Sequence, residues 1–205
     1  AAHPPGTLTV TGIGLVEVEP DEAVIHLSII TEARTAVAAS QNNATLTEAV
    51  VAAVSAQPNH GVTTGGLSVR PITNYEGGRP TIVGFRATHE VVVRTKVGYA
   101  GQIFDAGISA GANESSGIEF RRQDEGPQRE RALQVAVEQA LRDATIVASA
   151  AGVGLDGPES IEVEPGRGAL VPDRTVRVAA AETPVIPAAL TLSATVRVVF
   201  RTRCR

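Results

Sequence analysis

The feature that most constrains this fold is the alternation of apolar side chains near the C-terminus. From Leu190 to Phe200 every second residue is apolar, and most of the residues between them are threonine, serine or arginine. Successive side chains of a β-strand point to opposite faces of a sheet, so the pattern predicts a strand with one wholly apolar face. That face has to pack against another layer of secondary structure.

A similar alternation near the N-terminus predicts a strand over 7–19, where Gly12 and Gly14 indicate a bulge or bend. Pro20-Asp21 is typical of a turn into a second strand over about 23–29, so we expect an opening hairpin. We expect the alternating segments at both termini to lie in one sheet that is backed by helices.

Further strands are predicted over 62–72, 81–95, 116–121 and 160–164. The connection over 74–80 is short and rich in glycine and proline, so the two strands that it joins are expected to pair in antiparallel fashion.

Helical periodicity predicts three helices, over 35–56, 99–110 and 127–151. Gly152 stands where a C-terminal cap of the third helix is expected. The buried stripe of the first helix is predicted to contain Ala39, Leu46, Val50 and Val54. That of the third helix is predicted to contain Leu133, Val137, Ala140, Ala144, Val147 and Ala151.

This order predicts an α+β fold with a largely antiparallel sheet and Ala-rich helices packed on one face. Aromatic residues make up only 3% of the chain, so valine, isoleucine, leucine and alanine have to fill the core. We expect residues 1–6 to be a tail and 7–203 to form a single domain, with a long loop over 165–187. The similar order of elements in the two halves is consistent with an internal duplication.

Composition limits the partners and the location. The net charge of −4 argues against nucleic acid as a partner, because phosphate binding needs a basic face. No apolar run reaches the roughly 18 residues of a transmembrane helix. The chain begins with Ala1 and contains no methionine, which favours signal-peptide cleavage over a trimmed recombinant chain and predicts an exported protein.

The C-terminus carries four arginines and a single cysteine, Cys204. We interpret Arg197, Arg201, Arg203 and Arg205 as a solvated strand edge and tail that discourage aggregation. One cysteine cannot form an internal disulfide. We expect an exposed tail thiol, and a cross-link between two chains is the alternative.

The sequence contains two candidate motifs for cofactor or metal binding, and both are better interpreted as structural features. Gly12-Ile13-Gly14 lacks the third glycine and the following helix of a dinucleotide-binding loop. Acidic residues gather at Glu17, Glu19, Asp21 and Glu22, and we interpret them as a solvated turn rather than a Ca²⁺ site. We therefore predict no cofactor.

The residues of catalytic type do not form a known arrangement. Of His3, His26, His60 and His89, none has the spacing of a metal-binding pair, and His89 is expected to be a buried, hydrogen-bonded core residue. Ser115-Ser116-Gly117 lacks the preceding glycine of a hydrolase elbow. We predict no catalytic and no metal-ligating residue.

Charged side chains line the polar faces of two strands. Arg86, Glu90 and Arg94 share one strand, and Arg197 and Arg201 share another. If these strands are neighbours, cross-strand ion pairs are expected. A subunit or ligand surface rich in arginine is the alternative.

The ordered series of these motifs resembles the SIMPL-domain family over nearly the whole chain. The residues that carry the resemblance are spread along it: Val10 to Gly14, Pro20 to Ala23, Thr35 to Val54, Pro71 with Asn74-Tyr75, Gly84 to Ala87, Gly111 to Asn113, Gly117 to Phe120, the alanines at 132, 136, 140, 144 and 148 with Gly152, and Pro184 with the last strand. Ala188-Ala189 stand where the family is expected to have a glycine, and Ala179 to Ala181 in the middle loop are also unusual.

The resemblance implies an exported protein that is periplasmic, secreted or on the cell surface, associated with stress tolerance or antigenicity and oligomeric in some members. It implies no catalytic residues. Our leading hypothesis is a non-enzymatic envelope protein that assembles as a homo-oligomer, with another envelope protein as a further candidate partner. The alternatives are a periplasmic module that binds a small ligand and an enzyme of unrecognised type.

Overall fold

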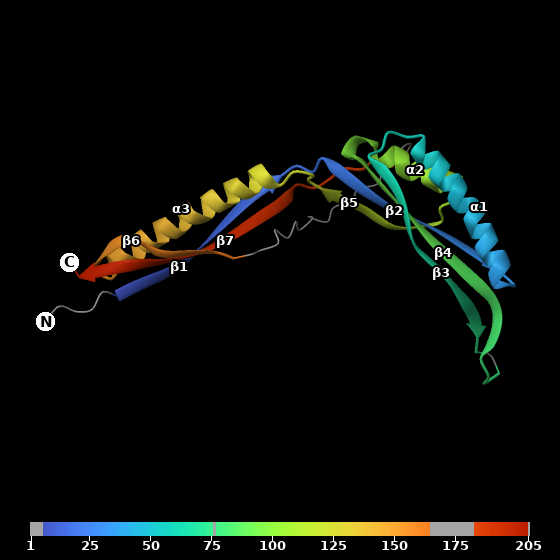
Figure 1. Ribbon diagram of the computed structural model, residues 1–205, viewed down its shortest axis with the longest axis horizontal. Coiled ribbons are helices and arrows are strands. Elements are labelled where there is room, and N and C mark those ends of the chain that lie inside the picture. Colours follow the sequence, from blue (N-terminus) through green and yellow to red (C-terminus); the bar gives the residue numbers. More distant parts are fainter. Residues whose placement is uncertain (1–5, 76, 165–182, 205) are drawn as a thin grey trace. The chain divides into compact units, whose positions relative to one another are not determined.

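The computed structural model describes residues 6–75, 77–164 and 183–204. Its elements follow the order β1 (Gly6–Val18), β2 (Glu22–Ala33), α1 (Ala36–Ser55), β3 (Gly61–Asn74), β4 (Thr81–Lys96), the 3₁₀-helix η1 (Val97–Tyr99), α2 (Ala100–Ala110), β5 (Glu114–Arg121), α3 (Gly126–Ala150), β6 (Val153–Val163) and β7 (Leu190–Cys204). The strands form two antiparallel sheets (Figure 1), so the predicted α+β class is confirmed.

Contacts within the chain divide it into two compact units. Among the described residues, unit 1 contains 6–19, 122–164 and 188–204, and unit 2 contains 20–75, 77–121 and 183–187. The expectation of a single domain over 7–203 stays a prediction, as does the internal duplication. No helix in these described ranges is both long and apolar enough to cross a membrane.

Unit 1 is a three-stranded sheet with the order β1-β7-β6, and α3 packs on one of its faces. The alternating residues of β7 behave as predicted, since Leu190, Val196 and Phe200 are fully buried. β1 pairs with β7 from Gly6 to Val18 without a register shift. The two termini therefore share a sheet. A bulge or bend was expected at Gly12 and Gly14, and no bulge interrupts the pairing there.

The two glycines of β1 serve instead to bring α3 close to the sheet. A Cβ atom added at Gly12 would overlap the carbonyl oxygen of Ala136, and one added at Gly14 would overlap that of Ala132. The facing side of α3 is correspondingly small. It consists of five buried alanines spaced four residues apart: Ala132, Ala136, Ala140, Ala144 and Ala148.

This alanine stripe corrects the prediction for the third helix. Val147, expected to be buried, is 45% exposed, and Leu133 and Val137 are only partly buried. The physical reason is the short distance between strand and helix. Next to two glycines only alanine fits beneath the helix, so the larger apolar side chains lie at its flanks.

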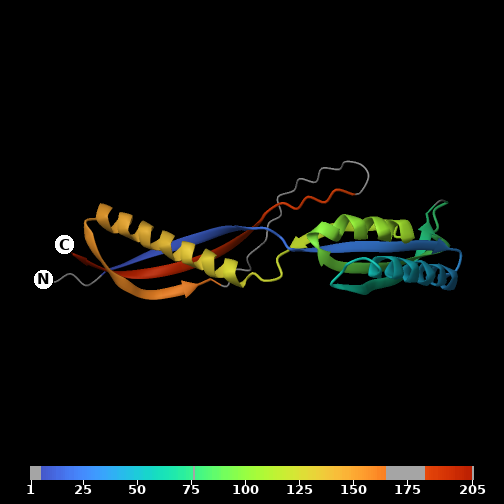
Figure 2. The ribbon, with the colours of Figure 1, turned by 90° about the horizontal axis from the view of Figure 1, so that it is seen from above.

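Unit 2 is a four-stranded sheet with the order β3-β4-β2-β5. Helices α1 and α2 lie side by side on one face of it (Figures 1 and 2). Ile25, Leu27 and Ile29 of β2 pack there against Val50 and Val54 of α1, and all five side chains are fully buried. The helices therefore cover one sheet face, and the opposite face carries charged and hydroxyl side chains together with aliphatic ones such as Val24 and Ile30.

The predicted opening hairpin is wrong, because β1 and β2 belong to different sheets. β1 pairs with β7, whereas β2 lies between β4 and β5. The turn at Pro20-Asp21 thus joins two strands of separate units, and local alternation cannot distinguish this connection from a hairpin.

A buried amide ties α1 to the middle of the sheet in unit 2. Asn43 is 1% exposed, and its Nδ2 atom donates to the carbonyl oxygens of Ile29 at 2.7 Å and Ala87 at 3.2 Å. The Thr47 hydroxyl donates to Asn43 Oδ1 at 3.3 Å. One side chain therefore links α1, β2 and β4, and the sequence prediction of an apolar stripe missed it.

Several predicted boundaries also change. β6 begins at Val153 rather than near 160, and Gly152 follows α3 with a φ of 70°, as expected of a cap residue.

Of the predicted loop over 165–187, residues 165–182 lie outside the described residues. Thr183 is tied to α2, because its backbone N–H and its hydroxyl donate to the Asp105 carboxylate at 3.1 and 2.6 Å.

Replacing Gly14 with alanine is expected to lower the free energy of unfolding by about 1–3 kcal/mol, because a helix backbone has to move to make room. Gly157→Ala in β6 is the control, since a Cβ there meets nothing within 4 Å. Urea unfolding measures both changes. Equal stability of the two variants would contradict the close packing described for α3.

Replacing Asn43 with alanine is expected to cost about 1–3 kcal/mol, because it removes two hydrogen bonds from a buried position and leaves a gap. Asn42→Ala, at the exposed neighbouring position of α1, is the matched control and should be nearly neutral. Thermal unfolding of both variants tests this, and a neutral Asn43→Ala would show that the amide does not hold the helix.

Candidate functional site

The sheet face of unit 2 opposite the helices carries its charged residues in rows across the strands. Arg70 of β3 lies opposite Arg86 of β4, which lies opposite Glu32 of β2. We call this set the arginine row. Two residues further along, Ser68, Thr88 and Ile30 face one another in the same way and form the hydroxyl row.

A third set, the acidic row, follows after two more residues. Glu90 of β4 lies opposite Ser28 of β2, which lies opposite Glu114 of β5. Neighbouring rows are about 7 Å apart, since each strand rises about 3.4 Å per residue. Apart from Glu32, the carboxylates of these rows are therefore separated from the two arginines along the strands by two hydroxyl residues and one isoleucine.

A cavity of about 360 Å³ opens over these rows. Every residue that lines it belongs to one of them: Ile30, Ser68, Arg70, Arg86, Thr88 and Glu114. The cavity thus lies within unit 2 and draws on all four strands of its sheet.

The two arginines of the cavity differ in their partners. Arg86 donates from Nη2 and Nε to Glu32 Oε1 at 2.7 and 2.8 Å. Arg70 has no ion pair or hydrogen bond from its side chain to any residue that the structure describes. Like charges directly opposite each other destabilise a sheet, and the single carboxylate of Glu32 offsets the charge of only one arginine.

The histidines of this unit lie beside carboxylates. His26 Nδ1 donates to Glu90 Oε1 at 3.0 Å, and His60 Nδ1 is 3.6 Å from Glu22 Oε1. His89 is on the helix-facing side, as predicted, but it is only half-buried and its ring has no hydrogen bond within the described residues. His3 lies outside those residues.

The other candidates are distributed over both units. Glu17 and Glu19 belong to unit 1, whereas Asp21 and Glu22 belong to unit 2. The Ser115 hydroxyl donates to the backbone carbonyl of His26 at 2.6 Å, so it is not directed at the imidazole. In ranges 6–75, 77–164 and 183–204, no three His, Cys, Asp or Glu residues are grouped to hold a metal ion.

The arginines of β4 and β7 lie in separate sheets, so the pairing considered between those strands does not occur. Cross-strand pairs form within each unit instead, as Arg86 and Glu32 do in unit 2. Arg201 lies 3.7 Å from Glu159, and Arg203 lies 3.2 Å from Asp156. Cys204 ends β7 opposite Val153, which places its backbone in the sheet.

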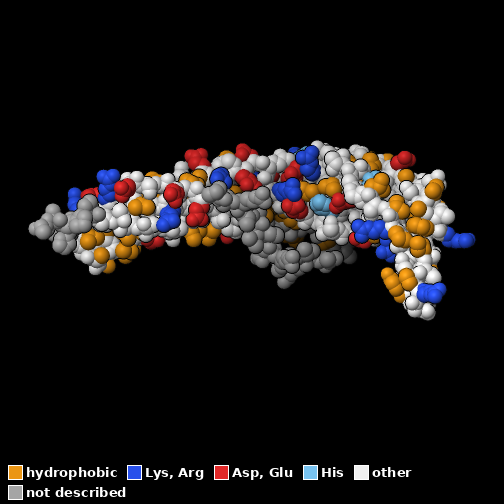
Figure 3. Space-filling model, turned by 60° about the horizontal axis from the view of Figure 1, so that its bottom comes forward, with side chains coloured by type: hydrophobic (Ala, Val, Ile, Leu, Met, Phe, Trp, Pro, Cys, Tyr) orange, Lys and Arg blue, Asp and Glu red, His pale blue; other side chains and the backbone are white. Residues whose placement is uncertain are grey.

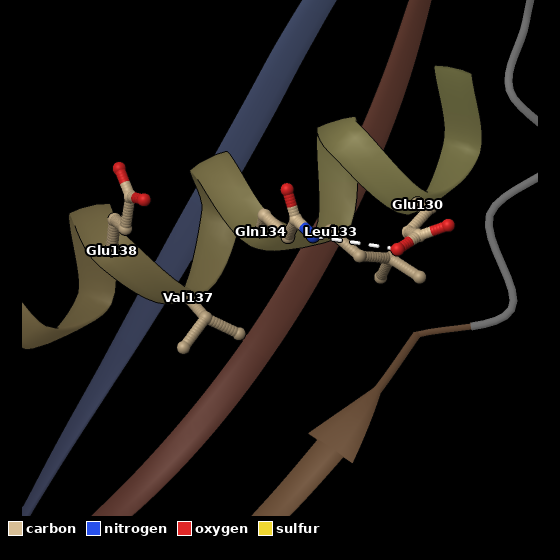
Figure 4. Close-up of a pocket in the computed structure, with 5 residues that line it drawn as sticks. All are labelled: Glu130, Leu133, Gln134, Val137 and Glu138. Atoms are coloured by element: carbon tan, nitrogen blue, oxygen red, sulfur yellow. Dashed lines mark hydrogen bonds between the residues drawn. The ribbon is translucent and has the colours of Figure 1, made fainter. Parts of the chain in front are cut away.

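A second cavity, of about 440 Å³, lies along α3. Leu133 and Val137 point from the helix on the side of β6, between Glu130 and Glu138 (Figure 4). On β6, Ile161 and Val163 lie opposite the buried Val198 and Val196, yet they are 54% and 50% exposed. We call Leu133, Val137, Ile161 and Val163 the α3–β6 surface.

The amino-acid sequence did not predict that Ser68, Arg70 and Glu114 line one cavity. A bulge in β3 between Gly65 and Ser68 and another in the pairing of β2 with β5 decide which residues share a row. The alternation within each strand was visible in the sequence, but the pairing that aligns four strands was not.

Comparison with known proteins shows a family match that covers nearly the whole chain. The family model SIMPL, described as a protein of unknown function (DUF541), matches residues 8–200. The 26 kDa periplasmic immunogenic proteins of Brucella melitensis and Brucella abortus are each 30% identical over 159 residues, which cover 74% of this chain and 64% of theirs. The chain thus matches less than two thirds of the length of these relatives.

The pair formed by Glu119 and Arg121 on β5 gives a measurable consequence. A hydrogen bond from Arg121 lowers the pKa of Glu119 below its ordinary value, and the charge of Arg121 acts in the same direction. A depressed pKa means that the pair stabilises the fold above the ordinary carboxylate pKa and loses this effect as the pH falls through the lowered value.

We expect the pKa of Glu119 to rise towards the ordinary value of a glutamate in Arg121→Gln, as measured by NMR titration of the side-chain carboxyl carbon. Arg142→Gln, at an exposed arginine of α3, is the control and should leave the titration of Glu119 unchanged. A titration of Glu119 that is identical in wild type and Arg121→Gln would contradict the hydrogen bond.

Proposed function

Because the chain belongs to the SIMPL family, we propose that it is an exported periplasmic protein that associates with further copies of itself and catalyses no reaction. The resemblance found in the sequence is thereby confirmed for the family. The periplasmic location is supported by the names of the two Brucella relatives. A role in stress tolerance stays an expectation from the resemblance.

The observation that carries self-association is a pair of exposed apolar surfaces on different parts of the chain. The first is the β3–β4 hairpin, which extends beyond α1 at its turn (Figure 1). Here Tyr75, Ile82 and Val83 are 75%, 62% and 56% exposed, and hydrophobic side chains gather along the hairpin in Figure 3. The second is the α3–β6 surface. Exposed apolar areas of this kind mark interaction sites.

The charges beside the two surfaces are complementary. Arg79 lies in the turn of the hairpin. The cavity of the α3–β6 surface is bordered by Glu130 and Glu138. Opposite charges at the rim of an apolar contact favour one partner and one orientation over others. This supports a second copy of the chain as the occupant.

The contact would be heterologous, because the hairpin of one copy meets a different surface on the next. Such contacts repeat from copy to copy and produce rings or filaments. β6 is also an edge strand, whose outer backbone groups remain open for pairing within the described sheet. An approaching hairpin can therefore add backbone hydrogen bonds to the apolar contact.

We expect the wild-type chain to form oligomers in sedimentation velocity at micromolar concentration. Ile82→Ser/Val83→Ser blocks the hairpin and Ile161→Ser/Val163→Ser blocks β6, so each double variant alone should be monomeric. A mixture of the two should give dimers, because one intact hairpin and one intact α3–β6 surface remain. Ile146→Ser, on the opposite side of α3 from Val137, is the control and should assemble normally.

Two results would contradict the proposal. One is a wild-type chain that stays monomeric at every concentration. The other is assembly by either double variant alone, which would place the contact elsewhere. Circular dichroism of each variant establishes that the fold is retained before assembly is compared.

A further inference from the structure

The cavity over the three rows of unit 2 contains one positive and one negative side chain that have no partner among the described residues. Arg70 and Glu114 both line it, and neither has a side-chain hydrogen bond or ion pair with any residue in the described ranges. They come from β3 and β5, the two outer strands of the sheet. Ser68 and Thr88 offer hydroxyl groups between them, and Ile30 provides an apolar floor.

In the arginine row, Arg86 forms an ion pair within the fold, whereas Arg70 has no ion pair with any described residue. Arg86 is held by two hydrogen bonds to Glu32, whereas Arg70 faces Arg86 directly. Placing two arginines opposite each other opposes folding unless something else compensates for the charge. Local features that cost stability are expected where a chain binds a ligand.

Hydrogen bonds fix the backbone next to Glu114, on the acidic side of the cavity. Asn113, next to Glu114, pairs with the backbone of Ile30: its Oδ1 atom accepts from the Ile30 N–H at 2.9 Å, and its Nδ2 atom donates to the Ile30 carbonyl at 2.7 Å. The Asn113 N–H also donates to the Ser28 carbonyl at 3.0 Å. Three hydrogen bonds thus fix the start of β5, and with it the backbone position of Glu114.

We propose that this cavity binds a small zwitterion, namely a free amino acid or a short peptide. The ligand carboxylate accepts from the Arg70 guanidinium and from the hydroxyls of Ser68 and Thr88. The ligand ammonium lies at Glu114. An aliphatic portion contacts Ile30. A cavity of about 360 Å³ accommodates a ligand of this size.

The arrangement favours a zwitterion over an ion of one sign. A simple anion would meet Arg70 but leave Glu114 facing it across the cavity, and a simple cation would have the converse problem. A ligand with both charges satisfies the two unpartnered groups at once, and charge-assisted hydrogen bonds are the strongest that side chains make. The proposal does not depend on self-association of the chain.

The test is an NMR titration of the ¹⁵N-labelled full chain with each of the standard amino acids and with diglycine. We expect at least one of these to give saturable shifts of the amides of residues 68–70, 86–88 and 114. Acetate and ethylammonium, which carry one charge each, are the ligand controls and should bind at least about tenfold more weakly.

Arg70→Gln and Glu114→Gln should each weaken binding of the best ligand by about tenfold or more. Arg94→Gln, on the same sheet face but outside the cavity, should leave it unchanged. Arg70→Gln should also retain or raise the melting temperature, because it removes the charge opposite Arg86. Loss of binding without loss of stability distinguishes a ligand site from a structural role of Arg70.

The proposal is overturned if no amino acid and no diglycine shifts these amides at 10 mM, roughly ten times a weak millimolar Kd. It is also overturned if acetate alone binds as tightly as the best zwitterion. Binding that survives in both Arg70→Gln and Glu114→Gln would show that any ligand lies elsewhere.

Discussion

The strand register of unit 2 determines what both faces of its sheet can do. Side chains alternate with a period of two, so a shift of one residue between β2 and β4 would exchange the core for the charged rows. In the observed register Leu27 lies opposite Val91 on the helix side, and Glu32 lies opposite Arg86 on the other. Folding and the candidate ligand site are therefore consequences of the same pairing.

Two features hold this register in place. The helix-facing residues of β2 and β4 form one buried cluster with α1 and α2, and a slip would expose it. Asn43 adds a directional constraint, because its amide reaches carbonyl oxygens of both central strands. A buried amide has to find its partners, and it does so here in only one alignment of helix and strands.

The sequence predicted best where one local pattern decided the structure. β7 is buried as its alternation indicated, and the cap at Gly152 has the expected backbone conformation. The sequence predicted least where contacts between distant segments decide the structure. Pro20-Asp21 has the chemistry of a hairpin turn but joins two units. The buried face of α3 was also misassigned, since hydrophobicity favoured Leu133 and Val147, whereas the approach of Gly12 and Gly14 selects alanine.

The candidate site was not predictable for a related reason. Arg70, Thr88 and Glu114 belong to no recognisable sequence motif. They come to line one cavity only because two bulges align their strands. The measurement that tests this alignment most directly is a set of cross-strand backbone NOEs in solution. The observed register predicts contacts of Arg86 with both Arg70 and Glu32, and of Thr88 with Ser68 and Ile30. NOEs displaced by one residue would turn Arg86 towards the helices and contradict the assignment of both faces.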